Sequence, residues 1–280
     1  MAALLLGAVA YDPKVVTIWE GFRTWLRSRD LDFDFVLYSH YERQVDDLVT
    51  GRIAVAWNSP LAWVRATRLA AATGVGVSAV AMRDTDRDLT SAVVVRADSP
   101  FASMADLGGR TVGVGAVDSP QATLLPLSLL RGEGVDVRVR RFDVGVGLHG
   151  DHIGGEREAG VALRDGQVDA ACMIDGNLLL FGQEGTLPAD SVRVVGQTQP
   201  YDHCNMTVGP AADPALVDPF VKLLLDMSYA DAEVRPLLDL EGLKQWLPGR
   251  TEGYAALERA VDEVGFYGAD GSVDAVDYRP

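Results

Sequence analysis

The chain has 280 residues, of which 48% are hydrophobic and 23% charged, and its formal net charge is −15 at pH 7. This composition is typical of a folded globular protein and excludes a disordered, collagen-like or coiled-coil chain. The acidic balance also argues against a nucleic-acid partner, because contacts with phosphates need a basic face.

The first ten residues, MAALLLGAVA, are apolar, but no basic residue precedes them and Tyr11 and Pro13 follow at once. A secretory signal would begin with basic residues and end in a removable spacer. We therefore interpret this run as the first core strand and expect a cytoplasmic protein. No apolar segment reaches the roughly 20 residues that a membrane-spanning helix needs, so we expect no membrane span.

Strand-like and helix-like segments alternate along the chain, as in an α/β fold. Apolar runs predict strands at 4–9, 33–38, 53–57, 75–82, 91–96, 111–115, 137–144, 168–174 and 192–198. Helical spacing of apolar residues predicts helices at 13–26, 42–49, 60–72, 119–130, 156–164, 177–181, 214–227, 230–240 and 251–264. We assign Trp19, Trp25 and Trp63 to the core because they follow the helical spacing. The Gly- and Asp-rich end after residue 265 is predicted to be a loose tail.

Two lobes are expected from this order of elements. Residues 1–92 with 206–280 form a discontinuous lobe 1, and residues 93–205 form lobe 2. The chain then crosses between the lobes twice, which creates a hinged cleft, and domain interfaces favour ligand sites.

Several segments resemble the type 2 periplasmic-binding-protein superfamily, in the branch that holds the phosphate and phosphonate binding proteins of ABC importers. They are GAVAYD (7–12), YERQ (41–44), GRIAVAWNSP (51–60), DLGGR (106–110), DSPQAT (118–123) and GQVDAA (166–171). The resemblance extends to about residue 245 and implies a two-lobed α/β fold with a small-molecule ligand in the interdomain cleft. It also implies that strand-end loops and helix N-termini hold the ligand.

The segment 118–123 lies between a predicted strand and a predicted helix. Free backbone N–H groups at such a helix start can hold an anion, and Ser119, Gln121 and Thr123 would add side-chain donors. The alternative is that Ser119 only caps the helix, with Pro120 at its first position.

Polar and aromatic residues also follow other predicted strands, at the strand ends where open α/β sheets bind ligands. The candidates are Tyr11, Trp57, Asn58, Ser59, Asp175 and Asn177. Asn58 and Ser59 could equally form a turn and a helix cap before Pro60.

Three of the four histidines fall in two short motifs, His149-Gly150-Asp151-His152 with Glu156 after it, and Asp202-His203-Cys204. Nitrogen, sulfur and carboxylate ligands of this kind suit zinc or iron. The same residues could instead form a metal-free pocket that binds ligand or moves protons, or a structural network at the hinge. Cys172, the other cysteine, lies in an apolar run and is expected to be buried and inert.

These observations lead to one main functional hypothesis and one alternative. The main hypothesis is a cytoplasmic enzyme of small-molecule metabolism that encloses an anionic or polar metabolite, with His149, His152, Glu156 and His203 as catalytic groups. The alternative is the non-catalytic substrate-binding component of a phosphate- or phosphonate-type ABC importer, whose partner is an ABC permease.

Overall fold

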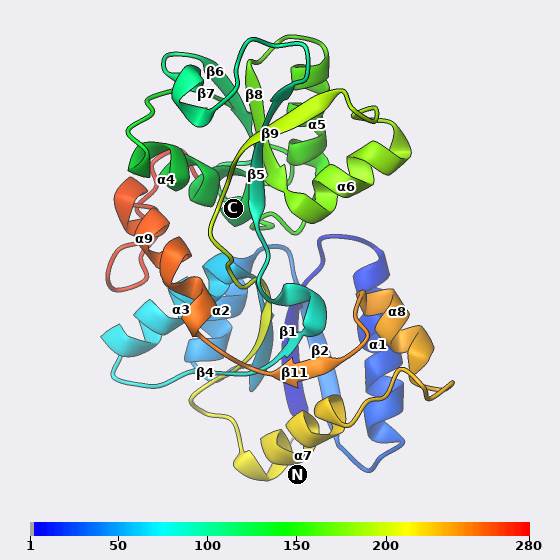
Figure 1. Cartoon of the computed structure of the whole chain (residues 1–280). Helices are drawn as coiled ribbons and strands as arrows, with labels where there is room; N and C mark the ends of the chain where they lie inside the picture. The colour runs from blue at the N-terminus through cyan, green and yellow to red at the C-terminus, as the bar shows by residue number, and fades with distance from the viewer. Residues whose placement is uncertain (1–2) are drawn as a thin grey trace. The chain divides into compact units, whose positions relative to one another are not determined.

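The computed structural model describes residues 3–280, which form two compact units. Unit 1 runs to Arg87 and includes Asp202–Ala255 and Phe266–Asp274, and unit 2 comprises Asp88–Tyr201, Ala256–Gly265 and Ala275–Pro280 (Figure 1). The chain therefore passes between the units after residues 87, 201, 255, 265 and 274. The sequence prediction placed the last two segments of unit 2 in lobe 1 and ended its lobes at residues 92 and 205.

Unit 1 is built on a mixed sheet with strand order β11-β4-β10-β3-β1-β2. The strands are β1 (Leu4–Val9), β2 (Phe33–Tyr38), β3 (Val55–Asn58), β4 (Ser78–Arg83), β10 (Asn205–Val208) and β11 (Trp246–Pro248). Strands β2 and β3 pair in parallel with β1, whereas β10 runs antiparallel to both β3 and β4. The sequence prediction missed β11, because this edge strand has three residues and ends in Pro248, which is tolerated only at such positions.

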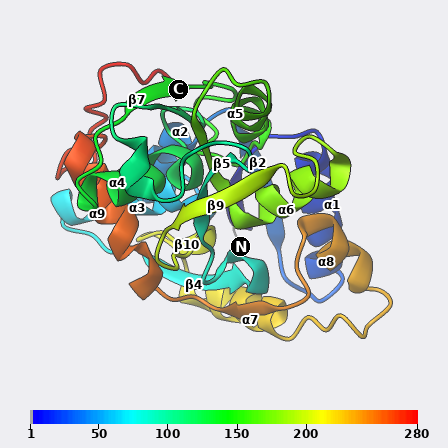
Figure 2. The same cartoon turned by 45° about the horizontal axis from the view of Figure 1, so that its top comes forward.

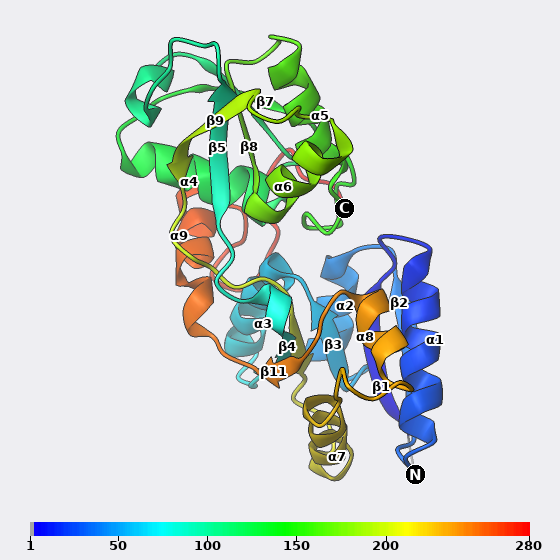
Figure 3. The same ribbon diagram turned by 45° about the vertical axis from the view of Figure 1, so that its right-hand side comes forward.

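Helices cover both faces of the unit 1 sheet. They are α1 (Lys14–Arg27), α2 (Tyr41–Val49), α3 (Pro60–Ala72), α7 (Pro214–Leu225) and α8 (Arg235–Glu241). Alternate residues of β1, among them Leu4 and Leu6, pack with Trp19 of α1 and Phe220 of α7 in one buried core. Figure 3 shows α1 and α8 on one side of the sheet and α2 and α3 on the other. Gly7 faces the second side, where a Cβ would lie 2.5 Å from the Ile53 side chain.

Unit 2 is built on a second mixed sheet, of order β7-β6-β8-β5-β9. Its strands are β5 (Ser91–Arg96), β6 (Thr111–Val114), β7 (Arg138–Arg141), β8 (Ala170–Ile174) and β9 (Val192–Gln197). Its main helices are α4 (Leu125–Gly132), α5 (Gly154–Arg164), α6 (Asp175–Glu184) and α9 (Ala255–Val264). The period-2 alternation of β5 sends Val94 toward the α5 and α6 face and Val93 toward the α4 face. Figure 2 shows α4 and α6 on opposite sides of this sheet.

The predicted helix at 119–130 is divided in the structure. Residues Pro120–Leu124 form η3, a short π-helical turn, and α4 begins only at Leu125. Pro126 accounts for this division, because it lacks the N–H that an uninterrupted α-helix would donate to the Ala122 carbonyl. Single π-turns of this kind are frequent at functional sites.

The prediction of a loose tail after residue 265 is wrong. Phe266, Tyr267 and Tyr278 are buried, the first two in unit 1 and the third in unit 2. Aromatic side chains bury enough apolar surface to fix a segment that glycine and aspartate would otherwise leave exposed. Within residues 3–280, each helix is too short or too polar to cross a bilayer.

Candidate functional site

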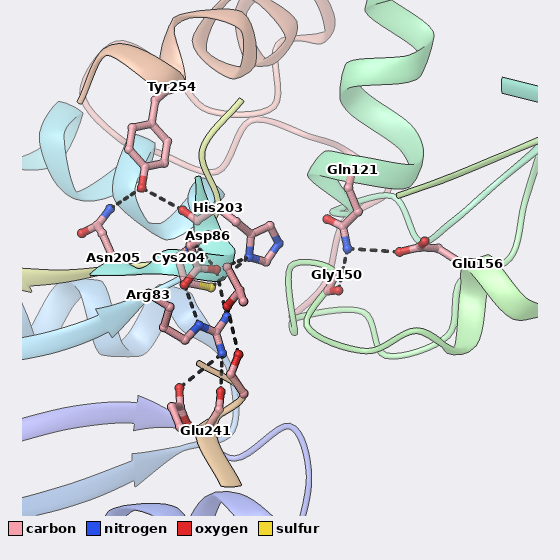
Figure 4. A network of polar contacts seen from close by, with 12 residues as sticks. Arg83, Asp86, Gln121, Gly150, Glu156, His203, Cys204, Asn205, Glu241 and Tyr254 are labelled. Atoms are coloured by element: carbon pink, nitrogen blue, oxygen red, sulfur yellow. Dashed lines mark hydrogen bonds and ion pairs between the residues drawn. The ribbon is translucent and has the colours of Figure 1, made fainter. Parts of the chain in front are cut away.

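In unit 1, Arg83 at the end of β4 is the centre of a buried ionic cluster. Its Nε and Nη2 donate to the two carboxylate oxygens of Asp86 at 2.5 and 2.9 Å, and its Nη1 donates to Glu241 at 3.3 Å. The guanidinium carbon lies 5.1 Å from the ring centroid of Trp57. Figure 4 shows the guanidinium between the two acidic side chains. The sequence prediction included Trp57 but none of the three charged residues.

The charges of this cluster reinforce one another. Burial raises the pKa of Asp86, but the charge and hydrogen bonds of Arg83 outweigh it and bring that pKa to about 2. Burial likewise opposes the charge of Arg83, yet Asp86 and Glu241 hold its pKa well above the ordinary value. Asp86 and Arg83 are therefore an ion pair at neutral pH.

His203 and Cys204, at the start of β10, lie against Asp86. The His203 Nδ1 is 3.1 Å from the Cys204 Sγ and 3.5 Å from the Asp86 Oδ1. The backbone N–H of His203 also donates to the Asp86 carbonyl at 2.8 Å. Among the described residues, Asp86, His203 and Cys204 are the group of three potential metal ligands whose donor atoms converge. Asp86 could not be found from local pattern, since it lies more than 110 positions before its two neighbours in sequence.

Asn58, at the end of β3, takes part in a buried chain of hydrogen bonds. Its Oδ1 accepts from Gln44 at 2.8 Å, and its Nδ2 donates to Thr207 at 2.9 Å. The chain continues through Asn205 to the Tyr254 hydroxyl, which donates to the His203 carbonyl at 2.8 Å. The amide of Asn58 thus holds β3 against β10. The series of hydrogen bonds ends at His203, beside the ionic cluster.

The other unit 1 candidates lie at strand ends, as predicted, but with different degrees of exposure. Ser59 is buried and caps α3 by accepting from the Ala62 N–H at 3.1 Å. Trp57 is buried with its ring edge-on to Trp246. Tyr11 is half-buried after β1, and the Lys14 ammonium lies 5.7 Å from its ring centroid.

In unit 2, the predicted anion-binding segment is entirely buried at its polar positions. Asp118, Ser119, Gln121 and Thr123 are each 4% exposed or less. The Ser119 hydroxyl caps η3 by accepting from the Ala122 N–H at 3.2 Å, and Thr123 donates to the Ala116 carbonyl at 2.8 Å. The capping role predicted for Ser119 is confirmed.

Gln121 links this segment to Glu156 of α5. Its Nε2 donates to the Gly150 carbonyl at 2.7 Å and to Glu156 Oε1 at 3.2 Å, as Figure 4 shows. Glu156 Oε2 accepts from the Asn177 amide and from the Ile174 N–H, both at 2.9 Å. The Gln121 Oε1 is buried and has no hydrogen-bond partner in the described part of the chain. Three of the predicted site residues, Gln121, Glu156 and Asn177, therefore meet in one network.

The loop before α5 folds over Asp118. The Asp118 Oδ2 accepts from the backbone N–H groups of Gly147 and His149 at 2.7 and 3.1 Å. Burial raises the pKa of Asp118, although the neighbouring His149 and these hydrogen bonds oppose the rise. The His149 ring lies in the interior, with its Nε2 3.2 Å from the Tyr278 hydroxyl.

His149 and His152 do not present their rings to one point. His149 adopts a positive φ of 49° and is buried, whereas His152 is exposed and accepts from the Gly154 N–H at 3.0 Å. The spacing of residues 149 and 152 predicts a single turn that brings both rings to one point, but the left-handed backbone at His149 breaks such a turn. Asp175, another predicted contact, is exposed at the start of α6 and accepts from Thr90.

The fold, with its two mixed sheets and covering helices, is that of a protein of the periplasmic-binding-protein type. One family model, described as "ABC transporter, phosphonate, periplasmic substrate-binding protein", matches residues 8–254. The chain belongs to this family. No curated protein sequence matches it.

Solved structures support the fold at low sequence identity. PhnD1 from Prochlorococcus marinus, in complex with methylphosphonate, has a TM-score of 0.69 at 15% identity and covers 94% of this chain and 98% of its own. XAC2383 from Xanthomonas citri, bound to ATP, has a TM-score of 0.71 at 17% identity, covering 94% and 100%. The aliphatic sulphonate binding protein SsuA from Escherichia coli has a TM-score of 0.58 at 18% identity, covering 94% and 86%. The predicted two-lobed α/β fold and the predicted superfamily are confirmed.

Two functional predictions are wrong. The family consists of substrate-binding proteins, so the main hypothesis of a metabolic enzyme gives way to the alternative, a solute-binding protein. The same finding overturns the predicted cytoplasmic location, because the family is one of periplasmic binding proteins. The absence of basic residues before the first strand misled this prediction. The predicted catalytic roles of His149, His152, Glu156 and His203 have no support in the family.

Proposed function

We propose that the protein is the substrate-binding component of an ABC importer and binds a small oxoanion of the phosphonate class. The permease of that importer would be its protein partner. The observation that carries the proposal is the family match over residues 8–254, which spans the larger part of both units. The complex of PhnD1 with methylphosphonate and the aliphatic sulphonate binding protein SsuA, both similar in fold, point to the same class of ligand.

The start of η3 in unit 2 supports an oxoanion as ligand. The Ser119 oxygen caps the turn by accepting from the Ala122 N–H, which leaves the hydroxyl proton able to donate, and the positive end of the helical dipole favours negative charge at this position. Asp118 precedes the turn, and burial raises the pKa of its carboxyl group above the ordinary value. The net charge of −15 does not exclude such a ligand, because local donors outweigh a distant field.

The proposal is tested by calorimetry and thermal unfolding with methylphosphonate, methanesulfonate, inorganic phosphate and ATP. We expect methylphosphonate to bind most tightly and to raise the unfolding free energy by about 2.7 kcal/mol at a hundredfold excess over its Kd. If none of these compounds binds at millimolar concentration, the oxoanion class is wrong.

A variant pair locates the ligand. Ser119→Ala is expected to lower the affinity for methylphosphonate at least tenfold, because it removes a donor at the proposed site. Ser103→Ala is the matched control, since Ser103 is the N-cap residue of the short η2 (Met104–Leu107), where its hydroxyl donates to Asp106 Oδ2 at 3.0 Å, and it lies outside the segment. Each variant loses about 1 kcal/mol of stability through its cap. Equal affinities in the two variants would exclude Ser119 from the site.

A further inference from the structure

Asp86, His203 and Cys204 bring three different metal-binding groups together in unit 1. One donor atom from each residue lies within 4.8 Å of the other two, and all three residues are buried. Asp86 ends η1 (Asp84–Asp86), while His203 and Cys204 lead into β10. Two segments that are remote in sequence thus bring an oxygen, a nitrogen and a sulfur donor together. A cluster of acidic residues would offer oxygen donors only.

The spacing of these atoms fits a four-coordinate transition metal. Bonds of about 2.1 Å to nitrogen or oxygen and about 2.3 Å to sulfur, at tetrahedral angles, place neighbouring ligand atoms about 3.4–3.6 Å apart. The His203 Nδ1 lies 3.1 Å from the Cys204 Sγ and 3.5 Å from the Asp86 Oδ1. Small side-chain shifts would therefore open room for an ion. A carboxylate, an imidazole and a thiolate together suit zinc better than magnesium or calcium, which prefer oxygen alone.

The charge of the surrounding cluster also favours a cation. The charged side chains that face one another here are the carboxylates of Asp86 and Glu241 and the guanidinium of Arg83, two negative groups and one positive group. A divalent ion bound by the Cys204 thiolate would add one net positive charge to this set. Arg83 would then hold the Asp86 carboxylate in place through its two hydrogen bonds, since ligating carboxylates are commonly hydrogen-bonded in this way.

We propose that Asp86, His203 and Cys204 form a zinc-binding site with water as the fourth ligand. The site lies where the chain leaves unit 1, after Arg87, and where it returns, at Asp202. Its role is to fix these two strand-end segments to each other, so metal binding adds to the stability of unit 1. The proposal does not depend on which solute the protein binds.

The test measures metal in the full-length chain, purified without an affinity tag, then loaded with Zn²⁺ or Co²⁺ and dialysed. We expect about one ion per chain, because the three ligands define a single site. The Co²⁺ form should show a thiolate-to-metal charge-transfer band in the near ultraviolet. Added Zn²⁺, but not Mg²⁺, should raise the thermal unfolding temperature of the metal-free protein.

Two cysteine variants provide a matched comparison. Cys204→Ser should abolish the charge-transfer band and reduce bound metal to background, whereas Cys172→Ser should change neither. Cys172 is a suitable control because it is also buried, in β8, where burial and Glu156 raise the pKa of its thiol to about 12. His203→Gln serves the same purpose as Cys204→Ser if the serine variant does not fold. Metal content below one tenth of an ion per chain in the wild type, or an unchanged band in Cys204→Ser, would overturn the proposal.

Discussion

Asp118 is a buried carboxylate whose surroundings favour its protonated form. One oxygen accepts two backbone N–H groups, from Gly147 and His149, while Oδ1 has no partner in the described part of the chain. The pKa in the folded state is therefore above the ordinary value of 3.8, which an unfolded chain would show. The carboxyl group contributes stability below about pH 3.8, and this contribution is lost as the pH rises through the folded-state pKa.

The variant Asp118→Asn tests whether the contribution of Asp118 to stability falls as the pH rises. The asparagine Oδ1 can accept both N–H groups without carrying charge, so we expect the stability of the variant relative to wild type to increase from pH 4 to pH 7. Urea unfolding at the two pH values measures the difference. Asp106→Asn is the control with the opposite sign, because hydrogen bonds from Ala102 and Ser103 lower the pKa of Asp106. Its stabilisation is lost as the pH falls below about 3.8, so this variant is also compared with wild type between pH 4 and pH 2. A variant of Asp118 that follows the same trend as the Asp106 variant would contradict the assignment.

Single residues show which parts of the site can be predicted from sequence. Gln121, Glu156 and Asn177 were predicted separately because each stands next to a strand or at a helix start, and the structure joins them in one network. Asp86 was missed because its position depends on the pairing of β4 and β10, which no local pattern encodes. The ring of His149 was misplaced because a positive φ depends on the hydrogen bonds of the whole loop.

At the level of elements, the amino end of α5 packs closely on the backbone that follows β6 and β7. A Cβ at Gly155 would lie 2.5 Å from the Phe142 carbonyl oxygen and 3.3 Å from the Ala116 nitrogen. Both neighbours are backbone atoms, so they cannot move aside as a flexible side chain would. This close approach positions Glu156, the next residue, to accept from Gln121.

Gly155→Ala is therefore expected to destabilise the protein by about 1–3 kcal/mol. Gly132→Ala is the matched control, because Gly132 is exposed at the end of α4, has no positive φ and has open space at its Cβ. There the alanine should stabilise by about 0.4–1 kcal/mol through the unfolded state. Chemical unfolding of both variants measures the difference, and equal effects would show that α5 can shift away from Phe142.

Elements whose apolar residues recur at a regular spacing were predicted with nearly the observed bounds. Elements that depend on contacts with distant parts of the chain were not. The predicted strands at 4–9, 33–38 and 91–96 and the helix at 60–72 coincide with β1, β2, β5 and α3. Buried apolar runs and the Ser59–Pro60 start define these elements locally. Residues 230–234, predicted as the first turn of a helix, lie outside α8, which begins at Arg235. Pro236 explains this start, since proline is favoured in the first turn of a helix.

At the level of the whole molecule, the C-terminal residues of the chain belong in part to unit 1 and in part to unit 2. Residues Phe266–Asp274 belong to unit 1, while Ala256–Gly265 and Ala275–Pro280 belong to unit 2. Within unit 2, α9 is joined to α4 by the ion pair of Arg131 and Glu263 at 3.1 Å. The last segment is held by Tyr278, which is fully buried, and by an ion pair between Asp277 and Arg141. A charge-rich end is thus part of the fold because a few aromatic residues anchor it.

Tyr278 tests how far this anchoring stabilises unit 2. Tyr278→Ala is expected to lower the free energy of unfolding by about 3 kcal/mol, because it removes a fully buried ring. Tyr278→Phe keeps the ring and removes the hydroxyl that contacts His149, so about 1 kcal/mol is expected. Val276→Ala should have no measurable effect, since Val276 is 86% exposed. Hydrogen exchange should report the loss in the loop around Gly147 and His149, whose amides Asp118 binds. If Tyr278→Ala exchanges these amides at the wild-type rate, the C-terminal segment does not support the loop, and the residues around Asp118 hold it by themselves.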